Sequence, residues 1–121
     1  MSVILKGIRG ATSVSENSKE AILIRTEELL RDMVEKNSLQ TDRIASVFFT
    51  TTLDLNAEFP AVAARKLGWT DVPLICAREI DVPGSLPLCI RVLIHYNILD
   101  DKPLKHVYLH EAKKLRKDLA D

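Results

Sequence analysis

The sequence predicts a single α+β domain over residues 1–121, built on a mixed five-stranded β-sheet with one long and two short helices. Three observations predict this class. Five separate runs are rich in apolar and β-branched residues, whereas one long stretch between them has the apolar period of a helix. The order β-α-β-α-β-β-β-α contains no repeat or linker, so we expect one sheet with its helices on one face. A chain of 121 residues also suits one modest core.

The first half of the chain contains the long helix. Residues 3–12 (VILKGIRGAT) form an extended, largely apolar run and predict the first strand. Over residues 17–37 the apolar side chains recur on one helical face and charged residues fill the other. Asn17 or Ser18 supplies the N-cap, and Asn37 marks the end of this helix.

The second half alternates shorter elements. Residues 43–52 (RIASVFFTTT) predict a strand because they are β-branched and aromatic. Residues 58–68 predict a short helix, with Pro60 in the first turn and Gly68 at the C-cap. The remaining elements are a strand over 72–80, a turn-rich loop over 82–87, strands over 88–97 and 105–110, and a short helix or tail over 111–119.

Composition and charge exclude several classes of protein. The formal net charge is zero and the pI is about 6.8, so no field attracts the chain to nucleic acid or anionic lipid. No segment approaches a membrane span and no signal peptide precedes the domain, which predicts a cytoplasmic protein. Cys76 and Cys89 form no disulfide or metal motif, and we expect both to be reduced thiols.

Charged residues inside strands are the main functional signal. Arg9 lies in the first strand, Arg91 lies between apolar residues of the fourth, and Glu79 ends the third. Alternation places Arg91 away from the face that resembles a helix-packed core. On residue types alone, a structural ion pair with Glu79 is slightly favoured. The other interpretation is an anion pocket, because two arginines to one glutamate leave a surplus positive charge.

Other chemical candidates are weaker. His106 and His110 are four residues apart, but at a strand end this spacing favours surface histidines over a metal pair. Tyr108 is equally suited to core packing and to ligand binding. Cys76 has no nucleophilic partner set, so a structural thiol is favoured. The basic run 113–117 (KKLRK) is most often a solvated face.

Five sequence blocks together carry a family resemblance. They are GIRGAT at 7–12, EFPAVAAR at 58–65, VPLICAREIDVPGSL at 72–86, CIRV at 89–92 and HVYLHEA at 106–112. In this order and spacing they resemble the monofunctional trimeric chorismate mutases of the pseudo-α/β-barrel type, over nearly the whole chain. The sheet face without helices, which predicts oligomerisation on its own, agrees with a trimer.

The resemblance implies an isomerase that converts chorismate to prephenate, the branch step toward phenylalanine and tyrosine. It implies a homotrimer with sites between subunits, a small-molecule substrate, and neither metal nor cofactor. The reaction is pericyclic and needs no nucleophile, which fits the absence of a catalytic triad from the sequence. The alternative function is a non-catalytic trimer that binds a small anionic metabolite.

Site residues follow from the same resemblance. Arg91, Glu79 and Arg9 are implied as the catalytic residues, and Phe59 and Arg65 as contributions from a neighbouring subunit. Strict alternation places Cys76 and Glu79 on opposite faces, so we expect a twist or bulge there, or a backbone contact from Cys76. The implied substrate-binding set is Arg9, Phe59, Ala61, Arg65, Leu74, Ile75, Cys76, Glu79, Arg91, Tyr108 and Leu115.

The chain departs from the family pattern at two positions. Val62 stands where a lysine is usual near the mouth of the cleft, and Ile75 stands where a threonine usually precedes the cysteine. Both positions concern the outer part of the binding site, so we expect them to affect substrate binding more than the chemical step.

Overall fold

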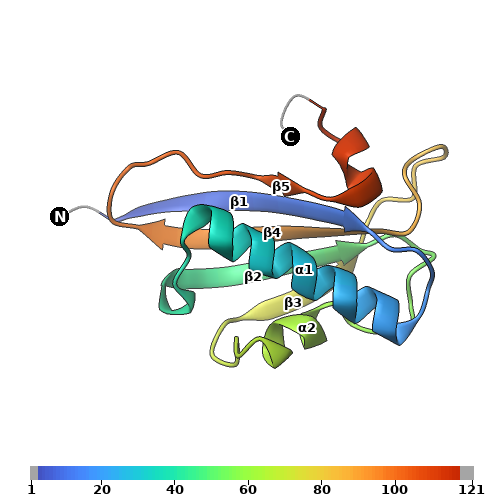
Figure 1. The fold of residues 1–121 in the computed structure, drawn as a ribbon, viewed down its shortest axis with the longest axis horizontal. Coiled ribbons are helices and arrows are strands. Elements are labelled where there is room, and N and C mark those ends of the chain that lie inside the picture. The colour runs from blue at the N-terminus through green and yellow to red at the C-terminus, as the bar shows by residue number, and fades with distance from the viewer. Residues whose placement is uncertain (1–2, 118–121) are drawn as a thin grey trace.

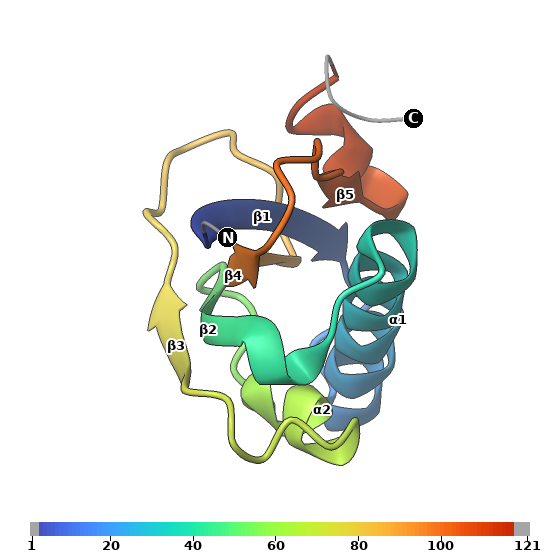
Figure 2. The ribbon, with the colours of Figure 1, turned by 90° about the vertical axis from the view of Figure 1, so that its left-hand side faces the viewer.

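A five-stranded sheet with helices on one face organises the chain, as predicted (Figures 1 and 2). The computed structural model describes residues 3–117. Strands lie in the order β3-β2-β4-β1-β5. Strands β2 and β3 run parallel, as do β1 and β5, and the pairs of β4 with β1 and β2 are antiparallel. The elements are β1 Ile4–Ser13, α1 Lys19–Asn37, β2 Ile44–Thr51, α2 Ala61–Lys66, β3 Leu74–Arg78, β4 Cys89–Ile98 and β5 Val107–Tyr108, with 3₁₀ helices η1 Thr41–Arg43 and η2 His110–Lys114.

Strand β4 is the central strand, and its side chains point alternately to the two faces of the sheet. Its even-numbered residues, Ile90, Val92, Ile94 and Tyr96, are buried under the helices. Arg91 and the odd-numbered residues that follow it are partly exposed on the other face, here named the open face. The alternation predicted from the sequence is therefore confirmed, and the open face carries Arg91.

Helix α1 begins and ends where capping residues predict. The Ser18 side chain accepts a hydrogen bond from the Ala21 amide at 3.2 Å, which identifies Ser18 as the N-cap. The helix ends at Asn37, and Ser38 follows in the left-handed conformation with φ 52°. Helix α2 ends similarly, because Gly68 follows it with φ +94°, a value that favours glycine.

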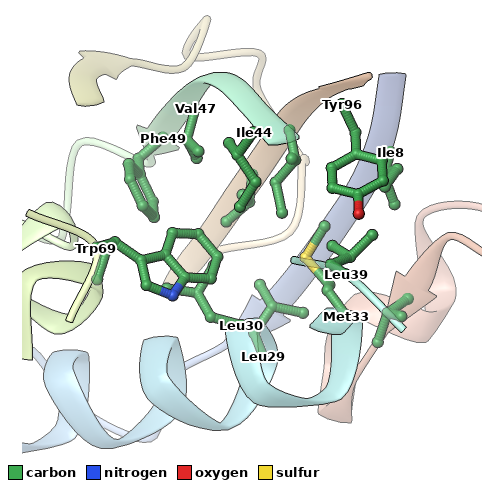
Figure 3. Close-up of a cluster of buried hydrophobic side chains, with 14 of the residues drawn as sticks. Ile8, Leu29, Leu30, Met33, Leu39, Ile44, Val47, Phe49, Trp69 and Tyr96 are labelled. Atoms are coloured by element: carbon green, nitrogen blue, oxygen red, sulfur yellow. The ribbon is translucent and has the colours of Figure 1, made fainter. Parts of the chain in front are cut away.

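The main core lies between α1, α2 and the sheet (Figure 3). Leu29, Leu30 and Met33 of α1 are fully buried and point toward the sheet, where Met33 lies beside Ile8 and Tyr96. Burial of each large apolar side chain stabilises the fold by about 1.5–3 kcal/mol. Packing on this face therefore stabilises the sheet, and the side chains of the open face are not needed for this core.

Glycine at position 10 lets α1 approach β1 closely. A Cβ atom at Gly10 would lie 2.4 Å from Met33 Sδ and 3.2 Å from Leu29 Cδ1. At position 10 the space beside β1 is therefore occupied by the helix.

The C-terminal region differs from the prediction. The expected strand over 105–110 is only Val107–Tyr108, and the expected helix over 111–119 is a 3₁₀ helix ending at Lys114; residues 118–119 lie outside the described part. The Asn37 side chain bonds both backbone groups of Lys105, and His110 adopts φ 53°, so the chain leaves the sheet at both ends of β5. The third strand is also shorter, covering Leu74–Arg78 of the expected 72–80.

A membrane-spanning helix is not found within residues 3–117.

We predict that Gly10→Ala destabilises the protein, because Met33 and Leu29 are buried and have little room to move. The expected loss is about 1–3 kcal/mol in the free energy of unfolding, measured by urea titration at fixed chain concentration. Gly7→Ala is the control, since a Cβ there would lie 3.4 Å from Leu93 Cδ1, an ordinary contact. Equal unfolding midpoints for the two variants would contradict the close packing of α1 on β1.

Candidate functional site

A groove of about 430 Å³ lies on the open face and collects charged side chains from across the sheet. Arg91 of β4 and Arg9 of β1 line it, together with Glu79, which directly follows β3. Tyr108 of β5 and Leu115, just after η2, also line it. Five of the residues implied as site residues by the resemblance therefore lie in one groove, although they come from distant parts of the sequence.

Arg91 and Glu79 form an ion pair within this groove. Arg91 Nε lies 3.5 Å from Glu79 Oε2, and Nε is buried with no hydrogen-bond partner among the described residues. The Arg91 side chain remains 41% exposed. The structural ion pair favoured on residue types thus exists, but it coexists with a ligand-sized groove and leaves much of the guanidinium accessible.

Neighbouring groups hold the Glu79 carboxylate in place. Thr50 Oγ1 donates a hydrogen bond to Oε2 at 3.0 Å, and the Ile80 amide donates to Oε1 at 3.2 Å. The Glu79 amide donates to the Thr51 carbonyl at 2.9 Å, which continues the pairing of β3 with β2 by one residue. Both carboxylate oxygens are thereby oriented before any ligand binds.

Among the described residues that line it, the groove has more arginines than carboxylates. Arg9, Arg91 and Arg116 line it, against one carboxylate from Glu79. Arg116 belongs to the basic run that the sequence predicted as a solvated face; it is partly exposed and also lines the groove. The two guanidinium groups of Arg9 and Arg91 beside the one carboxylate of Glu79 favour an anionic ligand.

The position of Tyr108 is compatible with both of the roles considered for it. Its side chain is 8% exposed and packs with Ala11 and Ala112, and partly buried Leu115 lies against the same cluster. Tyr108 also lines the groove. The apolar contacts hold the ring so that its hydroxyl has a defined position.

The two histidines near β5 have separate partners. His106 Nδ1 accepts a hydrogen bond from the Arg9 amide at 2.9 Å. His110 Nε2 lies 2.7 Å from Glu28 Oε1 of α1. Burial lowers the pKa of His106 below its ordinary value, and the positive charges of Arg9 and Arg116 lower it further.

A second pocket of about 400 Å³ lies beside β3 and is lined by other residues that the resemblance implies, including Cys76, which packs against the core under the helices. Phe59 and Cys76 line it. Cys76 packs against the core beneath the helices, whereas Glu79 faces the open side, so simple alternation accounts for their separation. Arg78 also lines this pocket, and its guanidinium donates to the carbonyls of Thr52, Leu53 and Leu55 at 3.2, 3.2 and 3.3 Å.

Four implied residues line neither pocket within one chain. Ala61 and Leu74 pack in or against the core. Arg65 is exposed on α2, and Ile75 is 55% exposed on β3. One chain therefore brings together only part of the implied set.

Phe48 and Thr50 line the groove but were not predicted. Thr50 lies directly opposite Arg91 in the pairing of β2 with β4, and Phe48 lies opposite Leu93. A polar residue such as Thr50 within a largely apolar strand could have indicated a functional position. Its pairing with Arg91 could not be predicted, because the order of the strands was not known from the sequence.

Comparison with known proteins identifies the family. The sequence model of the family described as "Chorismate mutase type I" matches residues 5–119. The chain belongs to this chorismate mutase family. It is 51% identical over 120 residues to "Chorismate mutase AroH" of Thermus thermophilus, covering 96% of this chain and 97% of that protein. It is 40% identical over 122 residues to the protein of the same name from Bacillus subtilis (strain 168), covering 98% and 94%.

A solved chorismate mutase from Clostridium thermocellum has the same fold, with TM-score 0.88 and 55% identity over 90% of this chain and 98% of that one. These findings confirm the predicted enzyme class, an isomerase that converts chorismate to prephenate. The non-catalytic alternative is not favoured.

We predict that the cysteine thiols are unreactive and dispensable for chorismate mutase activity. Burial raises the pKa of both Cys76 and Cys89, so each is largely protonated at neutral pH. Cys76→Ser is expected to retain most activity in a spectrophotometric chorismate assay, and wild-type thiols to react with a disulfide reagent more slowly than free cysteine. Complete loss of activity in a folded Cys76→Ser protein would indicate a covalent role instead.

Proposed function

We propose that the groove on the open face is the active site in which chorismate rearranges to prephenate. The observation that carries this proposal is the meeting of Arg9, Arg91 and Glu79 from three strands in one groove. Its volume of about 430 Å³ lies within the range of small-molecule sites. A surplus of arginines suits chorismate, which carries two carboxylates.

The reaction itself explains why this site needs no nucleophile or proton donor. Chorismate rearranges in one unimolecular step, as the ether C–O bond breaks while a C–C bond forms. A site helps by holding the flexible dianion in its compact diaxial shape and by stabilising negative charge that develops on the ether oxygen. Fixed guanidinium groups supply both effects.

We assign Arg91 to the ether oxygen, because it extends from the central strand and is held by Glu79. Arg9 and Tyr108 orient a carboxylate, and Glu79 accepts a hydrogen bond from the ring hydroxyl. Thr50 and the Ile80 amide orient Glu79 for that contact. Rigid strands position such groups more accurately than loops.

The complete site is assigned to the interface of a homotrimer. Phe59 and Arg65 are exposed on the far side of β3 from the groove, so they complete the site only from a neighbouring copy. Exposed apolar side chains support such contacts, including Leu5, Phe48, Ile75, Ile80 and Val82. Substrate-binding roles for Ala61, Leu74, Ile75, Cys76 and Leu115 belong to the same proposal.

The proposed location is the cytoplasm, where both cysteines would stay reduced.

The direct test is incubation of the purified protein with chorismate while the loss of its absorbance and the appearance of prephenate are followed. Turnover that scales with protein concentration supports the proposal. Saturable binding of chorismate without turnover would support the anion-binding alternative.

We predict that Arg91→Lys is strongly impaired, because one ammonium cannot reproduce the planar fork of a guanidinium. Removal of a donor aimed at developing charge costs about 2.7–4 kcal/mol, which is roughly a hundredfold to thousandfold in rate. The loss should fall on kcat more than on KM. Arg31→Lys on the exposed outer face of α1 is the matched control, and we expect its kinetics to equal those of the wild type. Near-native kcat in folded Arg91→Lys would overturn the role assigned to Arg91.

We further predict complementation between two impaired variants. Arg65→Ala and Arg91→Ala homotrimers should each be impaired, Arg91→Ala more severely. In a cyclic ring, every mixed trimer has one cleft in which an intact Arg91 meets an intact Arg65. Random reassembly of equal amounts should therefore restore about a quarter of wild-type activity.

Native mass spectrometry provides the control by showing that mixed trimers form. If they form while turnover stays at the average of the two variants, Arg65 and Arg91 do not share a site across chains.

A further inference from the structure

The backbone amide of Arg9 donates its hydrogen bond to a side chain, at a position where a neighbouring strand would ordinarily supply a backbone carbonyl. Parallel pairing of β1 with β5 covers only Gly10 with Val107 and Ala11 with Tyr108. One residue earlier, the Arg9 amide donates to the imidazole Nδ1 of His106 at 2.9 Å. The imidazole therefore takes the place of a carbonyl acceptor at the start of the short strand.

The end of α1 explains why no carbonyl is available there. Asn37 Nδ2 donates to the Lys105 carbonyl at 2.9 Å, and the Lys105 amide donates to Asn37 Oδ1 at 2.6 Å. Both backbone groups of Lys105 are thus bonded to α1 instead of β1. Without His106, the Arg9 amide would lose its acceptor on this edge of the strand.

We propose that His106 is a positioning residue that holds Arg9 in the groove only while its imidazole is neutral, so that protonation of His106 weakens substrate binding. This inference rests on the proposed role of Arg9 in binding a carboxylate of chorismate. His106 itself does not line the groove, so it acts through Arg9.

The chemistry of imidazole makes this contact sensitive to pH. Neutral histidine has one nitrogen that accepts, and the bond from Arg9 requires that nitrogen to be Nδ1. Imidazolium donates from both nitrogens. Protonation therefore replaces the hydrogen bond with repulsion between the Arg9 amide N–H and the new N–H on Nδ1 of His106. The charged groups facing the ring are Arg9 of β1 and Arg116 of the segment after η2, and both disfavour a further positive charge.

The direction of the pH effect follows from the lowered pKa of His106. A histidine held neutral in the folded protein supports the site fully above its ordinary pKa of about 6.5, and it loses this effect as pH falls through its lowered pKa in the folded protein, which lies below that value. Since Arg9 binds a carboxylate that substrate and transition state share, the loss should appear mainly as a rise in KM.

The experiment compares kcat and KM for chorismate from about pH 5 to about pH 8. In the wild type, we expect KM to rise about threefold to tenfold between the neutral and acidic ends, with a smaller change in kcat. His106→Asn places an amide oxygen near the position of Nδ1 without a titrating group, so its KM should stay near the neutral wild-type value throughout. His106→Leu removes the acceptor, and its KM should be high at every pH.

His110→Asn is the matched control, because this nearby histidine is bonded to Glu28 and not to the groove. Its profile should follow the wild type. Circular dichroism at each pH confirms that the compared proteins are folded.

An acid-dependent rise in KM that persists unchanged in His106→Asn would overturn the inference, as would a flat KM in the wild type. If His106→Leu does not fold, the His106→Asn profile decides the question by itself. A wild-type protein with no chorismate turnover at any pH would instead refute the proposed function.

Discussion

The fold and the groove both depend on strand pairing on each side of β4. Because β4 is paired with β1 and β2 along its length, its side chains have no freedom to change face. Val92 is directed into the core and Arg91 onto the open face by the same backbone geometry. A shift of one residue in this register would bury a guanidinium and expose the core, so the apolar packing that stabilises the sheet also fixes the position of the arginine.

Local patterns in the sequence predicted most of the fold. The apolar period, Ser18 and Gly68 were enough to place α1 and the end of α2 because capping and amphipathicity act within a few residues. The prediction was wrong near β5, where the deciding contact joins Asn37 to Lys105 across 68 positions of sequence. No local preference reports a contact of that range.

The residues that line the candidate groove were predicted in a similarly partial way. Arg9 and Arg91 are recognisable in sequence because a charge within an apolar strand requires an explanation. Thr50 and Arg116 lack that contrast, and their place in the groove follows from strand order and from the path of the chain after η2. The family resemblance supplied the rest of the implied set. Of the whole set, five residues line the groove of one chain and two line its second pocket.

The charge imbalance of the groove also has a thermodynamic consequence. Arg9 and Arg91 repel one another in the folded chain, and among the described residues that line the groove the Glu79 carboxylate offsets part of this repulsion. In the unfolded chain the same groups are separated and hydrated. An anion that binds between them favours the folded state by RT ln(1 + [L]/Kd), so the melting temperature becomes a function of anion concentration. The stability of this protein is therefore a property of the solution as well as of the sequence. A melting temperature that changes with chloride but not with chorismate would indicate only ionic screening.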